Sequence, residues 1–193
     1  MGMLKTNFKY KIVKNFLSEE EIEIGKHYLL LLHKNNITNF DLLQNNNGDS
    51  FFQKDPFTET ILIKKLKIME KETGLKLIPT YSFSRVYSYN ACLEKHKDRE
   101  ACEVSVSIMW GSDGTSWPIF IDGNKIEMSP GDGVIYLGCE LEHWREYFKG
   151  DWHAQSFLHY VDFNGPYKKF AYDQRNFCSS PEISYSNYIK NFN

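Results

Sequence analysis

The stretch Pro130-Gly131-Asp132-Gly133-Val134-Ile135-Tyr136 joins a tight turn to a short apolar strand, and it decides the fold. Similar turns at Asp113-Gly114 and Asp122-Gly123 separate further short apolar runs. The aromatic content of 16% also favours strands. Several short strands with turns between them predict a mainly β sandwich or barrel, including the double-sheet jelly roll. The expected strands are 75–89, 102–110, 117–121, 125–128, 133–137 and 154–161.

Two helices are expected before these strands. Ser18 followed by Glu21 is a capping box, and an apolar stripe continues to about residue 33. A second helix is expected over 57–72, ended by Gly74. Lysines 64, 65, 67 and 71 are interpreted as its solvated face. The fold class is therefore mainly β (α+β), with N-terminal helices packed on one sheet.

The 193 residues predict a single domain. Its parts are a helical part at about 18–74, a jelly-roll core at about 75–162 and a tail at 163–193. The net charge of -2 gives no signal for nucleic-acid binding, and no apolar run is long enough to span a membrane. The four cysteines form no C-x-x-C pair, which predicts reduced thiols in a cytoplasmic protein rather than a structural zinc site. They are Cys92, Cys102, Cys139 and Cys178.

The triplet His96-Lys97-Asp98 carries the clearest chemical signal, together with the later His143. Residues two apart in an extended segment point to the same side, so His96 and Asp98 can both face a barrel interior. Two imidazoles and one carboxylate form the facial triad that binds non-haem Fe(II) and leaves coordination positions open. A solvated charge run over 94–100 is the other interpretation of the triplet. His153 and His159 are rivals for the second imidazole.

With these residues in place, the chain resembles the 2-oxoglutarate- and Fe(II)-dependent oxygenases, most closely the prolyl-4-hydroxylase-like branch. The resemblance spans about 8–162 and includes the segment 13–21 that leads into the first helix. The family's H-x-D…H pattern matches His96, Asp98 and His143. The resemblance implies a double-stranded β-helix that uses Fe(II), 2-oxoglutarate and O2. The implied reaction couples decarboxylation of 2-oxoglutarate to hydroxylation of a prolyl or other amino-acid side chain, or of a small molecule.

The chain departs from that family where the cosubstrate binds. The family has an arginine or lysine about one strand after the distal histidine, where it binds the far carboxylate of 2-oxoglutarate. Here Trp152 and His153 occupy that place. A buried carboxylate needs a charge-assisted partner, and Arg145 shares strand parity with His143. The candidates for cosubstrate binding are Arg145, His153, Lys149, Arg85 and, by similarity to a family tyrosine, Tyr87.

Three functions remain open at this point. The complete set of His96, Asp98 and His143 favours an oxygenase. The departure at 152–153 favours a non-catalytic jelly-roll binding module. A cupin-like metalloenzyme without 2-oxoglutarate would need further ligands or another spacing. Trp110, Trp117, Trp144 and Trp152 are candidate pocket walls, and the sequence predicts neither the substrate nor an oligomeric state.

Overall fold

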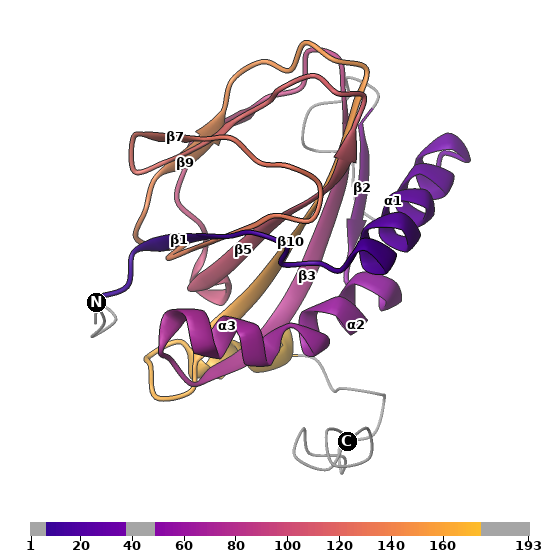
Figure 1. The fold of residues 1–193 in the computed structure, drawn as a ribbon. Coiled ribbons are helices and arrows are strands. Elements are labelled where there is room, and N and C mark those ends of the chain that lie inside the picture. Colours follow the sequence, from indigo (N-terminus) through magenta and orange to yellow (C-terminus); the bar gives the residue numbers. More distant parts are fainter. Residues whose placement is uncertain (1–6, 38–48, 175–193) are drawn as a thin grey trace.

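Two antiparallel β-sheets face each other in the computed structural model, which describes residues 7–37 and 49–174 (Figure 1). The larger sheet has six strands in the order β1-β8-β5-β10-β3-β2, and the smaller has four in the order β4-β9-β6-β7. Helices cover the outer face of the larger sheet. The predicted jelly roll with helices on one sheet is confirmed.

The strands of the two sheets are short except for three in the larger one. The long strands are β3 (Leu77–Ser88), β5 (Val104–Ser112) and β10 (Trp152–Asp162). The others are β1 (Tyr10–Val13), β2 (Ser50–Gln53), β4 (Leu93–His96), β6 (Ile119–Ile121), β7 (Asn124–Ile126), β8 (Gly133–Tyr136) and β9 (His143–Arg145). The helices are α1 (Glu19–Lys34), α2 (Pro56–Lys64) and α3 (Leu66–Thr73), with 3-10 turns η1 (Glu100–Cys102) and η2 (Lys168–Gln174).

The face of the larger sheet that meets the helices is buried and largely apolar, and its few polar side chains, such as Ser156, are hydrogen-bonded. Val106 and Ile108 of β5 and Leu158 of β10 are fully buried in one cluster with helix residues. The Tyr160 hydroxyl on this face donates to the carbonyl of Leu62 in α2, at 2.7 Å. Strand alternation therefore sends the other side chains of β5 and β10 toward the smaller sheet, where the candidate site lies.

The helices follow the sequence prediction at α1 and depart from it at Lys65. The capping box is present: Glu21 N–H donates to Ser18 Oγ at 3.2 Å, and Ser18 N–H donates to Glu21 Oε2 at 2.8 Å. The single helix expected over 57–72 is two helices that break at Lys65. That break lets the buried Lys65 ammonium pair with Glu21 Oε2 at 2.6 Å. The interpretation of the four lysines as a solvated face is wrong for Lys65.

The N-terminal and C-terminal parts both join the jelly roll. Strands β1 and β2 form the two edges of the larger sheet. Among the described residues, no helix is long and apolar enough to cross a membrane. The tail continues into η2, where Asp173 pairs with Lys54 at 2.7 Å and with Arg99 at 3.0 Å. The rest of the tail, the segment 38–48 and Cys178 lie outside the described residues. Cys92, Cys102 and Cys139 are free thiols.

Candidate metal centre

The two histidines of the predicted triad face each other across an antiparallel strand pair. His96 ends β4 and His143 begins β9, and the two are direct partners in the β4–β9 register. Directly opposed residues project to the same side of a sheet, which here is the side facing the larger sheet. The ring centroids of His96 and His143 lie 4.3 Å apart. Two residues 47 positions apart in sequence are thereby placed side by side.

Backbone contacts orient both imidazoles in the same way. His96 Nδ1 lies 2.7 Å from the carbonyl oxygen of Glu94, and His143 Nδ1 lies 3.0 Å from that of Leu141. A carbonyl only accepts, so Nδ1 is the protonated donor in each ring. In a neutral ring Nε2 then keeps its lone pair, as in metal-binding histidines. In a protonated ring Nε2–H instead points at Asp98.

Asp98 completes the donor set. Its Oδ1 lies 3.5 Å from Nε2 of His96 and 3.5 Å from Nε2 of His143, and the three donor atoms lie within 4.8 Å of one another. Its N–H donates to the carbonyl of Gly138 at 2.9 Å. Burial acts to raise the pKa of Asp98, but hydrogen bonds with His143 and His96 hold that pKa well below its usual range. The carboxylate is therefore ionised and available to a cation.

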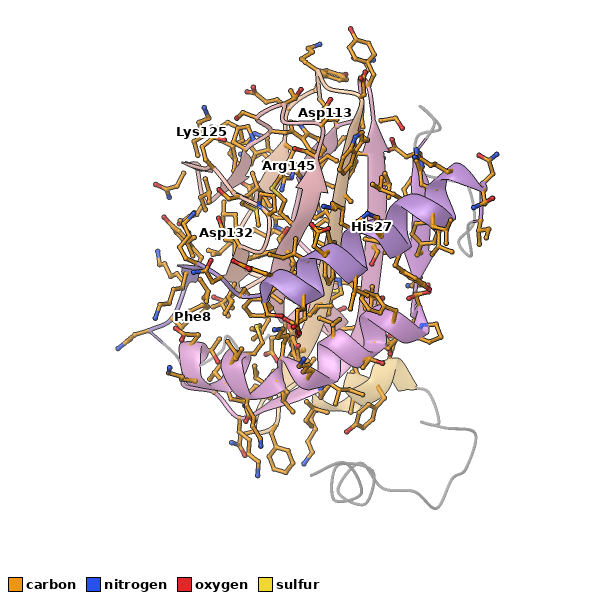
Figure 2. All side chains as sticks on the ribbon, turned by 45° about the vertical axis from the view of Figure 1, so that its right-hand side comes forward. Phe8, His27, Asp113, Lys125, Asp132 and Arg145 are labelled. Atoms are coloured by element: carbon orange, nitrogen blue, oxygen red, sulfur yellow. The ribbon has the colours of Figure 1, made fainter. Side chains whose placement is uncertain are left out.

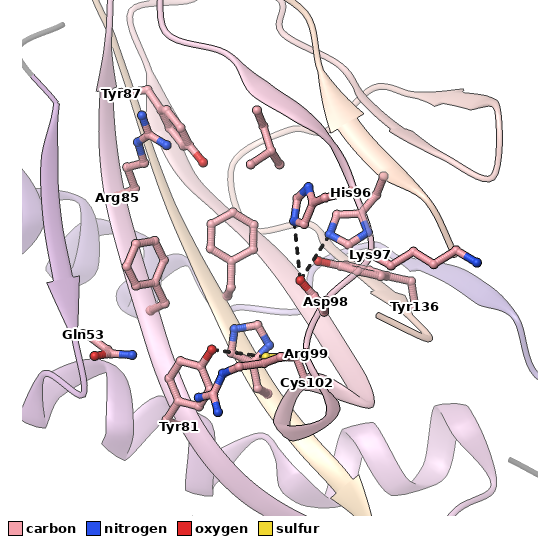
Figure 3. A pocket seen from close by; sticks show the side chains of 15 residues that line it. Gln53, Tyr81, Arg85, Tyr87, His96, Lys97, Asp98, Arg99, Cys102 and Tyr136 are labelled. Atoms are coloured by element: carbon pink, nitrogen blue, oxygen red, sulfur yellow. Dashed lines mark hydrogen bonds and ion pairs between the residues drawn. The ribbon is translucent and has the colours of Figure 1, made fainter. Parts of the chain in front are cut away.

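A cavity of about 360 Å³ adjoins the triad (Figure 3). Triad residues line one side of it, and aromatic side chains from β3 and β10 line the other. Strand parity predicts that Lys97 points away from the interior, but Lys97 follows the end of β4 and lines the cavity. The volume is within the range of small-ligand sites. The aromatic lining consists of Tyr81, Phe83, Tyr87, Tyr136 and Phe157.

Arg145 lies buried between the two sheets (Figure 2). The guanidinium donates to the Trp117 carbonyl and stacks on the Trp117 ring at 4.7 Å, but Nε has no hydrogen-bond partner. Among the described residues, no carboxylate lies within 4.0 Å of it. Burial lowers the pKa of Arg145 to about 10, so it stays a cation at neutral pH. A buried cation without an anionic partner is costly, so Arg145 favours an anionic ligand. It lines a neighbouring cavity and not the one beside the triad.

His153 is buried near Arg145, and both its ring nitrogens lack a hydrogen-bond partner. Burial and the charge of Arg145 lower its pKa well below the ordinary value, so the ring is neutral. It is the register partner of Tyr87, whose ring packs edge-on against Trp117 with centroids 4.7 Å apart. The His153 ring packs edge-on against Trp117 with centroids 5.2 Å apart, and the Arg145 guanidinium stacks on the same Trp117 ring, so the two unpartnered side chains lie on one aromatic neighbour.

Arg85 and Lys149 are placed differently from Arg145. Arg85 lines the cavity, but its guanidinium binds Asp49 through Nε at 2.8 Å and through Nη2, so its charge is balanced. It also stacks on the Tyr87 ring at 4.2 Å. Lys149 lies over the exposed rings of Tyr89 and Tyr147 on the surface, away from this cavity.

Of the four tryptophans suggested as pocket walls, Trp144 lines a neighbouring cavity. None of them lines the cavity beside the triad. Trp110 faces the helices, and Trp144 stacks on Phe120 with centroids 5.0 Å apart. Sequence reasoning also missed Gly138 and Cys102. An added Cβ on Gly138 would collide with Asp98 Oδ2 and the Cys102 carbonyl, and only the folded backbone reveals that.

Solved structures of prolyl hydroxylases have the same fold as this chain. A prolyl-4-hydroxylase from Pseudomonas putida superimposes with a TM-score of 0.61 at 16% identity, over 81% of this chain and 94% of that one. A viral collagen prolyl hydroxylase from Paramecium Bursaria Chlorella virus-1, solved with 2OG, gives 0.60 at 12% identity over 80% and 96%. This chain has the fold of the 2-oxoglutarate- and Fe(II)-dependent oxygenases.

Other structures with this fold carry out different reactions. The alpha ketoglutarate dependent carbocyclase SnoK from nogalamycin biosynthesis gives a TM-score of 0.66 at 12% identity, over 80% of this chain and 79% of that one. No protein-family model and no curated protein matches the sequence. The resemblance to the oxygenases is therefore shown at the level of fold, and function has to be argued from the site.

Proposed function

We propose that this protein is an Fe(II)- and 2-oxoglutarate-dependent oxygenase that hydroxylates an amino-acid side chain or a small molecule. The observation that carries the proposal is the meeting of His96, Asp98 and His143 at one cavity. Two Nε2 atoms and one ionised carboxylate are the donor set of the facial triad. In this proposal the three residues bind the iron. With 2-oxoglutarate and O2, the bound metal supplies oxygen activation.

Arg145 is the residue we propose for the far carboxylate of 2-oxoglutarate. It lies two positions after His143 on β9, on the same face of the strand, so it is about 7 Å further along the interior. Its Nε is without a partner, and its charge is unbalanced among the described residues. Arg85, by contrast, already holds Asp49. In this arrangement Arg145 takes over the role of the basic residue that the sequence lacks at 152–153.

His153 and Tyr87 have supporting roles in this proposal. A neutral imidazole can donate one hydrogen bond to a carboxylate, and both nitrogens of His153 are unpartnered. Tyr87 lines the cavity beside the triad, so its side chain orients the cosubstrate from the β3 side. Arg85 remains a candidate that stacks on Tyr87 and keeps its ring in place. The surrounding aromatic side chains limit access of water.

The wider description of the protein is also a proposal. We propose one domain over 1–193, a cytoplasmic location and a substrate that reaches the cavity as a small molecule or as one side chain of a peptide. The cavity volume of about 360 Å³ favours a group of that size over a folded polypeptide. Prolyl hydroxylation is the specific reaction suggested by the similarity to prolyl-4-hydroxylases.

Metal binding tests the triad. Purified protein is expected to bind one Fe(II) under anaerobic conditions, and His96→Ala or Asp98→Ala is expected to abolish this binding. His27→Ala is the matched control, because His27 is an exposed histidine on α1 (Figure 2). Iron content that is unchanged in both triad variants would overturn the metal assignment.

Cosubstrate binding separates the oxygenase from the two alternatives. Addition of 2-oxoglutarate to the anaerobic iron protein is expected to give a visible charge-transfer band. Arg145→Met is expected to raise the Kd about 10- to 150-fold, since a charge-assisted hydrogen bond contributes roughly 1.5–3 kcal/mol. Arg85→Met is the matched comparison. Iron binding without any 2-oxoglutarate binding would favour a cupin-like metalloprotein, and binding of neither would favour a non-catalytic module.

A further inference from the structure

A second set of metal-ligand side chains adjoins the triad and shares one residue with it. The donor atoms of Asp98, Cys102 and His159 lie within 4.8 Å of one another. Cys102 and His159 are both buried, and both line the same cavity as the triad. Figure 3 shows Cys102 beside the Tyr81 hydroxyl. His159 is therefore not part of the triad but belongs to a distinct donor set.

The two oxygens of Asp98 face the two donor sets. Oδ1 is the atom that lies 3.5 Å from the Nε2 atoms of His96 and His143. Oδ2 accepts a hydrogen bond from Ser105 Oγ at 3.2 Å, on the side of Cys102 and His159. One carboxylate can thus serve a cation on either side, and an ion on one side weakens the charge available to the other.

A hydrogen bond with Ser105 holds the ring of His159 in place. Its Nδ1 lies 2.8 Å from Ser105 Oγ. Ser105 Oγ also lies 3.2 Å from Asp98 Oδ2 and 3.2 Å from the Cys102 carbonyl oxygen. When the hydroxyl proton is directed to either of these, the hydroxyl accepts from Nδ1–H of His159. Nε2 then keeps its lone pair. The pairing of β10 with β3 shifts register between Leu158 and Tyr160, and such irregularities re-aim side chains near sites.

Cys102 gives this second set a chemical preference that the triad lacks. Its Sγ lies 3.2 Å from the Tyr81 hydroxyl, which can donate a hydrogen bond to a thiolate. A thiolate selects thiophilic ions, and a set of thiolate, imidazole and carboxylate matches the ligands that Zn²⁺ uses. The adjoining cavity supplies room for water as the fourth ligand. The triad, with nitrogen and oxygen donors only, suits Fe(II).

We propose that Asp98, Cys102 and His159 form a second metal site for a thiophilic divalent cation such as Zn²⁺, antagonistic to iron binding at the triad. On binding, the S–H bond of Cys102 breaks, an S–metal bond forms, and the proton leaves to solvent. No electron transfer is involved. Occupancy of this site engages Asp98 and lowers the affinity of the triad for Fe(II). The antagonism rests on the proposed function, whereas the binding itself does not.

Cobalt(II) is the probe for this site, because a cobalt–thiolate bond gives an intense near-ultraviolet charge-transfer band. Titration of the full chain with Co(II) is expected to produce this band. Cys102→Ser is expected to abolish it, and His159→Gln is expected to raise the Kd for cobalt at least tenfold. Cys92→Ala, Cys139→Ala and Cys178→Ala are matched controls that each keep the band. Thermal unfolding of every variant checks that it is folded.

His96→Ala separates this inference from the proposed function. The variant loses Fe(II) binding if the triad is the iron site, yet it is expected to keep the cobalt–thiolate band. Iron binding by the wild type without any thiolate band overturns the second site and leaves the oxygenase proposal standing. A thiolate band without iron binding supports the second site and overturns the iron assignment of the triad. A band that survives Cys102→Ser, or that disappears in His96→Ala, overturns the second site.

Excess Zn²⁺ tests the antagonism directly. Wild-type protein is expected to lose at least tenfold in apparent Fe(II) affinity when zinc is added, measured as iron retained after gel filtration. In Cys102→Ser the loss is expected to be several-fold smaller, since zinc can then compete only at the triad itself. Equal losses in the two proteins would contradict the antagonism.

Discussion

The two faces of the six-stranded sheet differ in what their side chains do. Toward the helices, residues such as Ile108 and Leu158 are apolar and fully buried, and the Tyr160 hydroxyl has a partner. Toward the smaller sheet lie histidines, an arginine and a glutamine, and both nitrogens of His153 and Oε1 of Gln155 have no hydrogen-bond partner. Burial without partners costs free energy, so these polar atoms of the inner face lower the stability of the fold unless a ligand binds them.

The largest expected effect contrasts one residue from each face. Trp110→Ala, on the helix side, is expected to lower the free energy of unfolding by about 3–5 kcal/mol, because a large buried side chain is replaced by a cavity. His153→Leu, on the inner face, is expected to be neutral or stabilising, because it removes two unpartnered polar atoms. Chemical denaturation measures both. Equal destabilisation would show that the inner face also contributes to stability.

The next effect concerns a charged pair on the helix side that does have its partners. Lys65→Met is expected to lower the free energy of unfolding by about 3 kcal/mol, because Glu21 loses its buried partner. Lys64→Met is the matched control. The Lys64 ammonium also pairs with Glu21, at 2.9 Å, but it is mostly exposed, so the free energy of unfolding is expected to fall by only about 0.5 kcal/mol.

The pH dependence of the Lys65 effect has a definite sign. Hydrogen bonds from Lys65 and Ser18 outweigh burial and lower the pKa of Glu21 from 4.5 to about 2. The contribution of Glu21 is therefore complete above about pH 4.5 and is lost as the pH falls toward 2. Thermal unfolding between pH 2 and 6 is expected to show a steeper acid loss in wild type than in Lys65→Met. Parallel curves would contradict the assignment.

A smaller effect is expected on the inner face, at Gly138. Gly138→Ala places a Cβ against Asp98 Oδ2 and the Cys102 carbonyl, so the carboxylate has to move. Iron affinity is expected to fall about 10- to 100-fold, which is typical for residues that position metal ligands. Gly111→Ala is the control, because its Cβ would meet the flexible Lys26 side chain at 3.2 Å. Isothermal titration measures the iron affinity of both variants. Equal affinities would contradict a role of Gly138 in positioning Asp98.

The last effect concerns the pH dependence of stability at Glu103, immediately before β5, whose Oε1 also lacks a partner. Burial raises its pKa from 4.5 to about 7. Between those values the folded carboxyl holds a proton that the unfolded one has lost, so stability falls as the pH rises, by at most about 1.4 kcal/mol per pH unit. Glu103→Gln is expected to flatten this slope in thermal unfolding, whereas the exposed Glu142→Gln is expected to leave it unchanged.

Local signals carried much of the fold. The capping box at Ser18 and Glu21 and the Pro130–Gly133 turn each act within a few residues, so the sequence was sufficient to predict them. The burial of Lys65 was not predictable from local signals, because its ammonium pairs with Glu21, 44 residues away. Strand β2 was missed for the same reason: four residues acquire strand structure only by pairing with β3.

The candidate site divides along the same line. Strand parity and spacing were sufficient to group His96, Asp98 and His143, and the structure brings these three together. Parity also singled out Arg145, but its missing partner becomes visible only once Trp117 and the neighbouring strands surround it. Cys102 was interpreted as an ordinary thiol, because its proximity to His159 depends on two strands that are distant in sequence.

The pairing of His96 with His143 has a consequence for how the smaller sheet holds together. Strands β4 and β9 are short, and β4 has a neighbour on one side only. A slip of one residue would turn His96 to the opposite face. A metal ion that binds both histidines would fix the register of β4 against β9. The stability that it adds grows with the logarithm of its concentration. Amide hydrogen exchange in β4 would thereby report metal occupancy without any substrate being known.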